Sequence, residues 1–254
     1  MINEIHNENC LDTMAKMEDN FIDLTVTSPP YDNLRTYNGY SFDFEAIAKE
    51  LYRITKDGGV VVWIVGDATI KGSETGTSFK QALYFKECGF KLHDTMIWNK
   101  PNSMPNVIKT RCRNSFEYMF VFSKGKPNTT NMLTEECKYA GKTIKRTKGS
   151  QYEATGKKIR NDKTNDRKIK SNVWDIIVGG TNYKHPATFP EKLANDHIIS
   201  WSNEKDIVYD CFGGSGTTAK MSKTLNRKWI ASEVSKDYCD IIKQRLSEVG
   251  TLFN

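Results

Sequence analysis

Short apolar runs and helix-period patterns alternate along most of the chain. Apolar, β-branched runs predict strands, and apolar residues that recur every three or four positions predict helices. The predicted strands cover residues 21–27, 60–65, 91–98, 117–123, 206–210 and 229–234. The predicted helices cover residues 42–54, 78–88, 189–201, 217–225 and 236–249, and Asp57-Gly58-Gly59 is predicted to be a turn. This alternation predicts an α/β fold with a mainly parallel sheet covered on both faces.

The pattern stops between Lys124 and Ser171, where Lys, Thr, Gly and Asn dominate and apolar residues are scarce. Such a segment inside an otherwise periodic chain indicates an insertion or a separate lobe rather than part of the core. We therefore predict one α/β domain built from residues 1–123 and 172–254, interrupted by an insertion at about 124–171.

The net charge of +6 is unevenly distributed. From Lys138 to Lys170 there are 12 Lys or Arg against 3 acidic residues, a balance of +9, so the rest of the chain sums to −3. A basic block on a nearly neutral body indicates a polyanionic partner. A solvated, disordered loop explains the charge equally well.

Composition also bears on location and on metals. The longest apolar run, 60–65, is too short to span a bilayer, and the first residues lack the basic and apolar regions of a signal peptide. We therefore expect a cytoplasmic protein that does not enter a membrane. The six cysteines form no C-x-x-C pair and do not cluster with the four histidines, which argues against a zinc site and favours free thiols.

A glycine-rich turn follows the strand predicted at 206–210. Gly214-x-Gly216-x-x-Ala219 fits the G-x-G-x-x-G/A fingerprint of nucleotide-binding folds. Glycines allow the tight turn and a close approach of a ligand, and the following helix N-terminus favours an anionic group. Glu233 stands about 20 residues after the loop, at the end of the next strand, where an acid can bind ribose hydroxyls. Loop and acid together favour a nucleoside cofactor, either NAD or S-adenosylmethionine.

A second candidate loop, Ser28-Pro29-Pro30-Tyr31, follows the strand predicted at 21–27. The two prolines lack N–H donors, so nearby backbone carbonyls stay free to accept hydrogen bonds. Ser28 adds a hydroxyl and Tyr31 adds an aromatic face, which together suit a planar group that carries an amine. A Pro-Pro turn by itself is more often structural, but ligands of open α/β sheets bind at the carboxyl ends of strands.

The order of these features resembles the amino-methylating DNA methyltransferases of the β arrangement, in which the catalytic motif precedes the cofactor motif and the target-recognition region lies between them. The resemblance spans nearly the whole chain outside about 125–170. It is carried by Thr27-Ser28-Pro29-Pro30-Tyr31 and Asp210-Cys211-Phe212-Gly213-Gly214-Ser215-Gly216-Thr217-Thr218, and by segments 57–60, 63–67, 97–102, 113–118 and 184–193. It implies a Rossmann-like methyltransferase fold with circularly permuted motif order, and S-adenosylmethionine as the cofactor.

The resemblance also implies site residues. The catalytic residues are Ser28, Pro29, Pro30 and Tyr31. The cofactor-binding residues are Asn9, Cys10, Ser28, His185, Phe189, Pro190, Asp210, Phe212, Gly213, Gly214, Ser215, Gly216, Thr217, Thr218 and Glu233. The candidate DNA contacts are Trp98, Lys100, Lys109, Arg111, Arg113, Lys142, Lys145, Arg146, Lys148, Lys157, Lys158 and Arg160, although an ion pair with Glu117 is an alternative role for Arg113. Asn9 departs from the family, which often has Asp at this position.

The expected reaction is methylation of the exocyclic amine of a base that is flipped out of duplex DNA. A cytosine C5 enzyme needs a nucleophilic cysteine, typically in a Pro-Cys pair, and the sequence has none. In the family, Ser before Pro-Pro accompanies cytosine N4 methylation more often than adenine N6 methylation. We therefore favour cytosine N4 and keep adenine N6 as the alternative.

Other interpretations explain less. RNA or protein amine methyltransferases usually carry the glycine loop before the Pro-Pro-Tyr loop, the reverse of the order found here. A nicotinamide oxidoreductase leaves the Ser-Pro-Pro-Tyr loop and the basic insertion without a role, and a catalytically silent DNA-binding protein has no need for an intact catalytic loop. Double-stranded DNA is the expected partner, and a cognate restriction endonuclease and a homodimer remain open.

Overall fold

The computed structural model describes residues 1–30, 42–105, 110–144, 162–163, 165–179 and 189–249. The chain divides into two compact units. The first joins Met1–Asn131 to Asn172–Asn254, and the second is Met132–Ser171. The second unit begins several residues after the boundary near residue 124 that the composition suggests.

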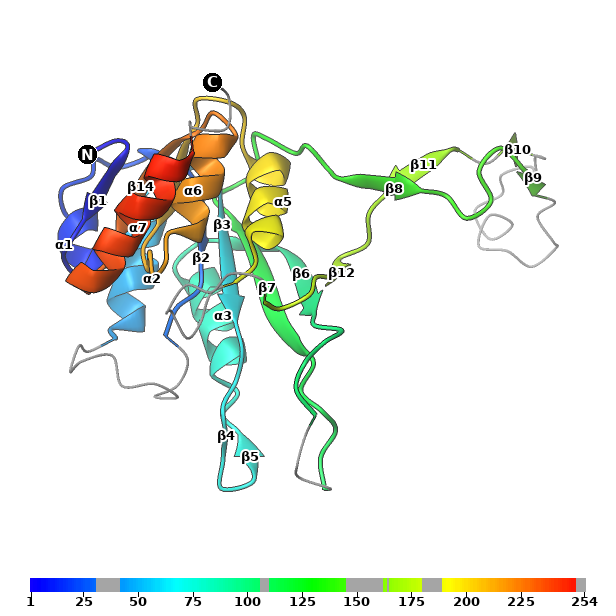
Figure 1. Ribbon diagram of the computed structural model, residues 1–254, viewed down its shortest axis with the longest axis horizontal. Coiled ribbons are helices and arrows are strands. Elements are labelled where there is room, and N and C mark those ends of the chain that lie inside the picture. The colour runs from blue at the N-terminus through cyan, green and yellow to red at the C-terminus, as the bar shows by residue number, and fades with distance from the viewer. Residues whose placement is uncertain (31–41, 106–109, 145–161, 164, 180–188, 250–254) are drawn as a thin grey trace. The chain divides into compact units, whose positions relative to one another are not determined.

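An eight-stranded sheet forms the framework of the first unit (Figure 1). Its strands are β1 (Glu4–His6), β2 (Ile22–Thr27), β3 (Thr55–Val65), β6 (Lys91–Asn99), β7 (Phe116–Ser123), β12 (Val173–Asp175), β13 (Ile207–Asp210) and β14 (Lys228–Ser232). They lie in the order β1-β14-β13-β2-β3-β7-β6-β12, and β7 alone runs antiparallel to its neighbours. The predicted mainly parallel α/β sheet is confirmed.

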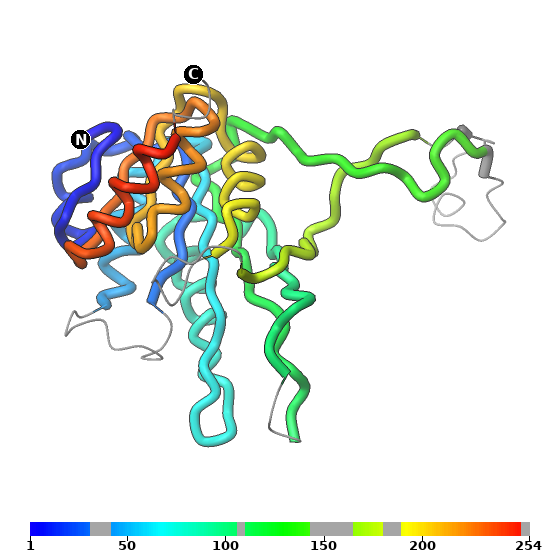
Figure 2. Tube along the Cα trace, viewed as in Figure 1, coloured from blue at the N-terminus to red at the C-terminus, as the bar shows by residue number. Residues whose placement is uncertain are grey.

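Helices cover both faces of this sheet (Figure 2). The helices are α1 (Cys10–Met14), α2 (Phe44–Ile54), α3 (Thr77–Glu87), α5 (Glu191–Trp201), α6 (Thr217–Thr224) and α7 (Lys236–Glu248). α1, α2 and α3 pack together on one face, where the larger apolar core lies, and α5, α6 and α7 pack together on the other. The five predicted helices are confirmed within two residues at each end.

The turn predicted at 57–59 is wrong, because these residues belong to β3. The pairing of β3 with β2 is irregular here: Thr55 pairs with Ile22, whereas Val60 pairs with Leu24. Gly58 accommodates the extra residues with φ of 79°, a conformation that glycine adopts at low cost. The two glycines therefore mark a bulge within a strand rather than the end of one.

Several short elements escape the periodicity analysis because they are too short to show a repeat. In the first unit these are β1, α1 and a hairpin of β4 (Thr69–Ile70) and β5 (Ser73–Glu74). In the second unit they are β8 (Thr134–Glu136), β9 (Thr143–Ile144), β10 (Asp162–Lys163) and β11 (Arg167–Ile169), which form two antiparallel pairs. Within the described ranges, no helix combines the length and apolar character needed to cross a bilayer.

A cluster of aromatic rings fixes α2 and α3 to the sheet. Phe85 of α3 is fully buried, and its ring stacks on Phe122 of β7 at 4.5 Å between centroids. Trp63 of β3 meets the edge of Phe85 at 5.1 Å and donates its indole N–H to the buried Gln81 at 2.9 Å. The only polar atom of the indole is thus satisfied inside an apolar core.

We expect Phe85→Ala to lower the free energy of unfolding by about 3 to 5 kcal/mol, because it removes a fully buried ring and leaves a cavity. Leu83→Ala on the same helix is the control, since Leu83 is 60% exposed and its truncation should cost less than about 0.5 kcal/mol. Urea denaturation of the two variants measures both values. Similar losses for the two would contradict this description of the core.

Candidate active site at the carboxyl edge of the sheet

Three neighbouring parallel strands place the candidate loops at one edge of the sheet. β13 pairs with β2 through Tyr209 and Thr25, and with β14 through Asp210 and Ala231. The carboxyl ends of these strands therefore lie side by side. The loop that begins at Ser28 follows β2, the glycine loop follows β13, and Glu233 follows β14. The sequence motifs thus meet at one place although about 180 residues separate the first two.

The glycine loop is pressed closely against its surroundings. Gly216 has φ of 80°, and a Cβ added there would lie 2.8 Å from the side chain of Ile242 on α7. A Cβ on Gly213 would lie 3.2 Å from the carbonyl oxygen of Ser232, to which the Gly213 N–H also donates. Gly216 is therefore required by both backbone conformation and space, whereas at Gly213 only the close Ser232 carbonyl disfavours a side chain.

A buried carboxylate joins the glycine loop to the catalytic strand. Asp210 is 2% exposed and accepts hydrogen bonds from the Thr27 hydroxyl at 2.7 Å and the Phe212 N–H at 3.1 Å. The Thr218 hydroxyl, at the start of α6, donates to the carbonyl of Val26 at 3.0 Å. The hydrogen bonds of the Thr27 hydroxyl and the Val26 carbonyl thus fix the end of β2 directly before Ser28.

Burial raises the pKa of Asp210 to about 6, and the donors from Thr27, Phe212 and Thr218 offset only part of this effect. The sequence suggests a direct cofactor contact for Asp210. The Asp210 carboxylate is almost fully buried and already accepts hydrogen bonds from Thr27 and Phe212, and a cofactor contact for this residue stays a prediction. Asp210 connects the end of β2 to the start of the glycine loop.

Glu233 occupies the position expected for the ribose-binding acid. One carboxylate oxygen accepts the N–H of Gly214 and the other accepts the N–H of Ser235, each at 2.8 Å. Burial raises the pKa of Glu233, and the two N–H donors partly counteract this. Each oxygen retains a second lone pair, so the carboxylate can still accept hydroxyl donors from a ligand.

A buried arginine that the sequence analysis missed braces the glycine loop. Arg245 of α7 donates to the Ser215 carbonyl at 2.6 Å, to the Ser215 hydroxyl at 2.9 Å and to Thr217 at 3.2 Å. It also pairs at 2.7 Å with Glu191 of α5, which pairs with Lys220 as well. Although burial alone would raise the pKa of Glu191, these two cations hold it below its usual value. The sequence did carry a signal: Arg245 lies on the buried face of α7.

Aromatic side chains flank the loop on its other side. Phe212 lies 5.7 Å from Phe42 and 6.2 Å from Trp63 between ring centroids, in edge-to-face arrangements. Phe42 and Phe44 lie 6.3 Å apart, which continues the cluster onto α2. The loop is thus bordered by a carboxylate on one side and aromatic rings on the other, a combination suited to a nucleoside.

Other predicted residues fall in two groups. Ser28 and Pro30 are half-buried after β2, Pro29 is buried, and Phe189 and Pro190 precede α5. The side chains of Ser215, Thr217 and Thr218 are buried. Tyr31, His185, Lys109, Lys145, Arg146, Lys148, Lys157, Lys158 and Arg160 lie outside the described residues.

The amino-terminal candidates lie beside β14. β1 pairs with β14, and the Asn9 side chain that follows it accepts the N–H of Leu11 at 2.9 Å, which caps α1. Cys10 is 5% exposed within the core, where burial raises its pKa to about 12. The Cys10 thiol is therefore protonated and packs as an apolar group.

One of the predicted DNA contacts, Trp98, is wrong. Trp98 is 3% exposed, and its indole N–H donates to the carbonyl of Ile176 at 2.8 Å, so it belongs to the core. Lys100 pairs with Glu117 and lies over the Trp98 ring, with little exposure of its own. Arg113 donates to the carbonyl of Ser103 at 3.4 Å. Arg111 and Arg113 are exposed.

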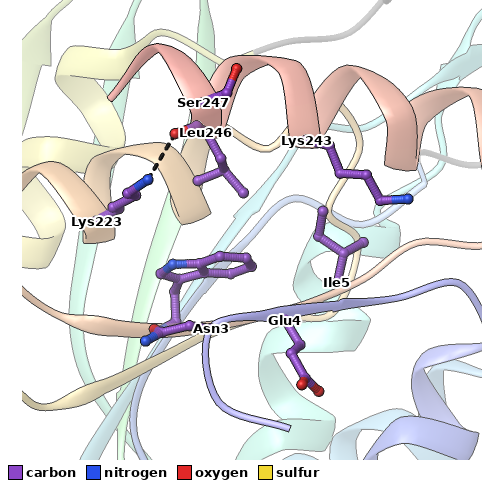
Figure 3. A pocket seen from close by; sticks show the side chains of 8 residues that line it. Asn3, Glu4, Ile5, Lys223, Lys243, Leu246 and Ser247 are labelled. Atoms are coloured by element: carbon purple, nitrogen blue, oxygen red, sulfur yellow. Dashed lines mark hydrogen bonds between the residues drawn. The ribbon is translucent and has the colours of Figure 1, made fainter. Parts of the chain in front are cut away.

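A groove at the opposite edge of the sheet is not part of this site (Figure 3). Trp229, Ile5 and Leu246 are its apolar lining residues, and Lys223 and Lys243 also border it. Lys223 is occupied by the carbonyl of Leu246 at 2.9 Å. The groove opens beside the first residues of β1 and β14, whereas the candidate loops follow the last residues of the strands.

Comparison with known proteins supplies the family. The model of the N6/N4 DNA methylase family matches residues 22–244, which include both loops and Glu233. The chain belongs to this family. The predicted recognition and reaction class, methylation of DNA, are confirmed, and so is S-adenosylmethionine as the cofactor of the family.

Individual relatives are similar over nearly the whole chain. The orphan methyltransferase M.BamHII of Bacillus amyloliquefaciens is 58% identical over 89% of this chain and 88% of its own. The type II methyltransferase M.SmaI of Serratia marcescens is 26% identical over 91% and 86%. Among solved structures, the cytosine-N4-specific PvuII DNA methyltransferase has a TM-score of 0.73 at 22% identity and covers 95% of this chain and 85% of its own. The M1.HpyAVI complex with S-adenosylmethionine has a TM-score of 0.62 at 22% identity, over 96% and 99%. These likenesses confirm the Rossmann-like methyltransferase fold.

The residues at the carboxyl edge fit S-adenosylmethionine. The two carboxylate oxygens of Glu233 match a ribose diol, which offers two hydroxyl donors. Phe212 supplies an aromatic ring next to the loop, and the loop lies against α7 too closely for side chains at Gly213 or Gly216. This chain thus offers the acceptor pair and the narrow turn that a nucleoside requires.

The pKa of Asp210 leads to a pH-dependent prediction. Because the folded-state pKa of about 6 exceeds the unfolded value of about 4, the contribution of Asp210 is most favourable below pH 4 and is lost as pH rises through 6. Asp210→Asn cannot ionise. We expect the stability of this variant relative to the wild type to rise by about 2 to 3 kcal/mol between pH 4 and pH 7.5.

Denaturant unfolding of the cofactor-free proteins across this pH range measures the difference. Asp237→Asn, which alters an acid in the first turn of α7, is the control and should show no comparable change. A wild-type–variant difference that stays constant with pH would contradict a raised pKa at Asp210.

Proposed function

We propose that this chain methylates the N4 amine of cytosine in double-stranded DNA. Ser28 before Pro29-Pro30 supports this choice, because Ser at that position accompanies N4 methylation more often in the family. The fold similarity to the cytosine-N4-specific PvuII enzyme is consistent with it. Adenine N6 remains the alternative, since enzymes of both kinds make up the family.

The geometry at the end of β2 is the observation that carries the catalytic proposal. Thr27 is fixed to Asp210, so the Ser28 hydroxyl and the Pro29 carbonyl have defined positions next to the glycine loop. These two acceptors bind the two amine hydrogens and turn the nitrogen lone pair out of the base plane. Tyr31 stacks on the flipped base. Most of the acceleration comes from positioning rather than from acid–base chemistry.

Cofactor binding is assigned to the residues bordering the glycine loop. S-adenosylmethionine supplies the electrophilic methyl group when it is bound. Glu233 accepts the ribose hydroxyls, Phe212 contacts the adenine, and the backbone from Gly213 to Gly216 borders the methionine part. Asn9, His185, Phe189 and Pro190 complete this proposed set.

The second unit is proposed to be the target-recognition region. Its described residues include exposed cations such as Lys142, Arg167 and Lys168, although Lys168 also pairs with Glu135 at 3.0 Å. Cations of this kind give affinity for phosphates, whereas sequence selectivity needs contacts to base edges. Lys142, Lys145, Arg146, Lys148, Lys157, Lys158 and Arg160 are the proposed phosphate contacts.

The biological setting is proposed from the names of the relatives. The relative at 58% identity is called an orphan methyltransferase, whereas several more distant ones are called type II methyltransferases. We therefore propose a DNA-marking enzyme inside the cell that acts without a dedicated restriction endonuclease. Cleavage of unmethylated host DNA by the product of a neighbouring gene would argue for a restriction–modification pair instead.

The target base can be determined directly. DNA from cells expressing the protein is digested to nucleosides, and mass spectrometry identifies the methylated product. We expect N4-methylcytosine and no N6-methyladenine above the level in cells that carry an empty vector. Detection of N6-methyladenine alone would overturn the N4 assignment, but it would still support an amino-methyltransferase activity.

We expect Ser28→Ala to reduce kcat by about 10- to 100-fold, because one hydrogen bond to the reacting amine is lost. Its Kd for S-adenosylmethionine should stay within about twofold of the wild type, since the proposed role concerns the base. Single-turnover methylation and calorimetry measure the two quantities. Ser103→Ala, in the segment after β6, is the matched control. A Ser28→Ala protein with full turnover would exclude this role for the hydroxyl.

A further inference from the structure

Two segments of the first unit extend beyond the carboxyl edge of the sheet (Figure 1). The β4–β5 hairpin follows β3, the strand next to β2, and the connection from β6 to β7 is described at residues 100–105 and 110–115. Both leave the sheet at the edge where Ser28 lies, since Thr27 pairs with Trp63 and Val65 pairs with Tyr118. They therefore project on the side from which a duplex must approach.

The tip of the β4–β5 hairpin has an unusual residue. Ile70 pairs with Ser73, so Lys71 and Gly72 form a two-residue turn, and both have positive φ, 49° and 81°. A turn of this kind prefers Asn-Gly, because a side chain such as lysine is disfavoured at positive φ. Lys71 is exposed, and none of the described residues forms an ion pair or hydrogen bond with its ammonium. Turn stability alone does not account for a lysine here.

The hairpin is held at its base and at its tip. Asp67 accepts the Ser78 N–H at 2.9 Å and the Ser78 hydroxyl at 2.5 Å, which ties the hairpin to the start of α3. Arg111, from the segment 100–115, donates to the carbonyl of Gly72 and lies 3.8 Å from Glu74. The lysine is thus presented on an ordered arm rather than on a free loop.

The charge of the neighbouring segment matches an anionic partner. Residues 100–115 contain Lys100, Lys109, Arg111 and Arg113 and no acidic residue. Lys100 is paired with Glu117, but Arg113 is exposed. Six residues separate Val65 from Lys71, so the extended chain reaches up to about 20 Å past the sheet edge. Duplex DNA carries one phosphate per about 1.7 Å of its axis, so an arm of this length passes several of them.

We propose that the β4–β5 hairpin is a DNA-contacting arm, in which Lys71 binds a backbone phosphate and Arg111 holds the tip in place. The arm is separate in sequence from the basic second unit, so it forms an additional contact surface. It gives affinity and orientation rather than base selectivity, because a phosphate contact carries no sequence information. This inference rests on the DNA-methylating function for the side from which the duplex approaches.

The test uses Lys71→Asn, which removes the charge and installs the residue that the turn prefers, so the hairpin remains folded. Lys126→Asn is the matched control, because Lys126 is exposed after the end of β7, at the opposite edge of the sheet. Fluorescence anisotropy with a random-sequence duplex of about 30 base pairs, which spans roughly three helical turns, gives Kd at several salt concentrations.

For Lys71→Asn we expect Kd to rise about three- to tenfold at low salt, and the slope of log K against log salt to fall in magnitude by about 0.9, the value for one phosphate contact. The melting temperature should not fall, and the Kd for S-adenosylmethionine should not rise. Lys126→Asn should retain the wild-type slope.

An unchanged slope for Lys71→Asn, or an equal fall for Lys126→Asn, overturns the proposal. So does a change in oligomeric state of Lys71→Asn in sedimentation experiments, because the tip would then contact a second copy of the chain. All three results leave DNA methylation intact, provided that the wild type and the variants still transfer methyl groups to DNA. Failure of the wild type itself to methylate DNA would instead contradict the proposed function.

Discussion

The hydrogen bond between Asp210 and Thr27 connects the two halves of the site. It links the last residue of β13 to the last residue of β2, the two strands that precede the glycine loop and the catalytic loop. An ionised carboxylate in the core is costly, which the raised pKa of Asp210 expresses. An apolar pair at these positions would avoid that cost but would provide no directional bond. The geometry of the two loops therefore depends on an interaction that is unfavourable for stability on its own.

The buried Arg245 follows the same logic on the other side of the glycine loop. Its guanidinium donors satisfy the carbonyl and hydroxyl of Ser215 and pair with Glu191 at the start of α5. A buried charge pair is a weak source of stability, but its fixed geometry holds three elements in one arrangement. Together, Asp210 and Arg245 fix the two ends of the glycine loop through hydrogen bonds to Phe212 and Ser215.

Much of this arrangement could be predicted from the sequence, because longer strands and helices show a clear repeat of apolar residues. The glycine loop, Glu233 and the loop at Ser28 were placed correctly at strand ends. Elements of two to five residues, such as the β4–β5 hairpin and α1, carry no measurable period. The bulge at Gly58 imitates a turn, because both need a positive φ.

Side-chain burial at the site was harder to foresee. Trp98 is expected to contact DNA, but it lies on the same side of β6 as the buried Met96, which makes it a core residue. Asp210 and Arg245 are charged residues that the tertiary structure buries, and their partners, Thr27 and Ser215, lie 183 and 30 residues away in the chain. Local sequence can indicate that such a residue faces the core, but it cannot identify the distant group that compensates the charge.

The charged residues near the candidate site differ from those in the rest of the chain. Around the candidate site, the carboxylates of Asp210 and Glu233 have pKa values that burial raises, and the cations Arg245 and Lys220 are paired with Glu191. The excess cations lie elsewhere, on the segment 100–115 and in the second unit. A cation beside the target amine would repel the positive sulfur that carries the methyl group. It would also destabilise the positive charge that develops on the attacking nitrogen. If these cations bind phosphates, as proposed, affinity for DNA comes from segments of the chain other than the loops that carry the chemistry.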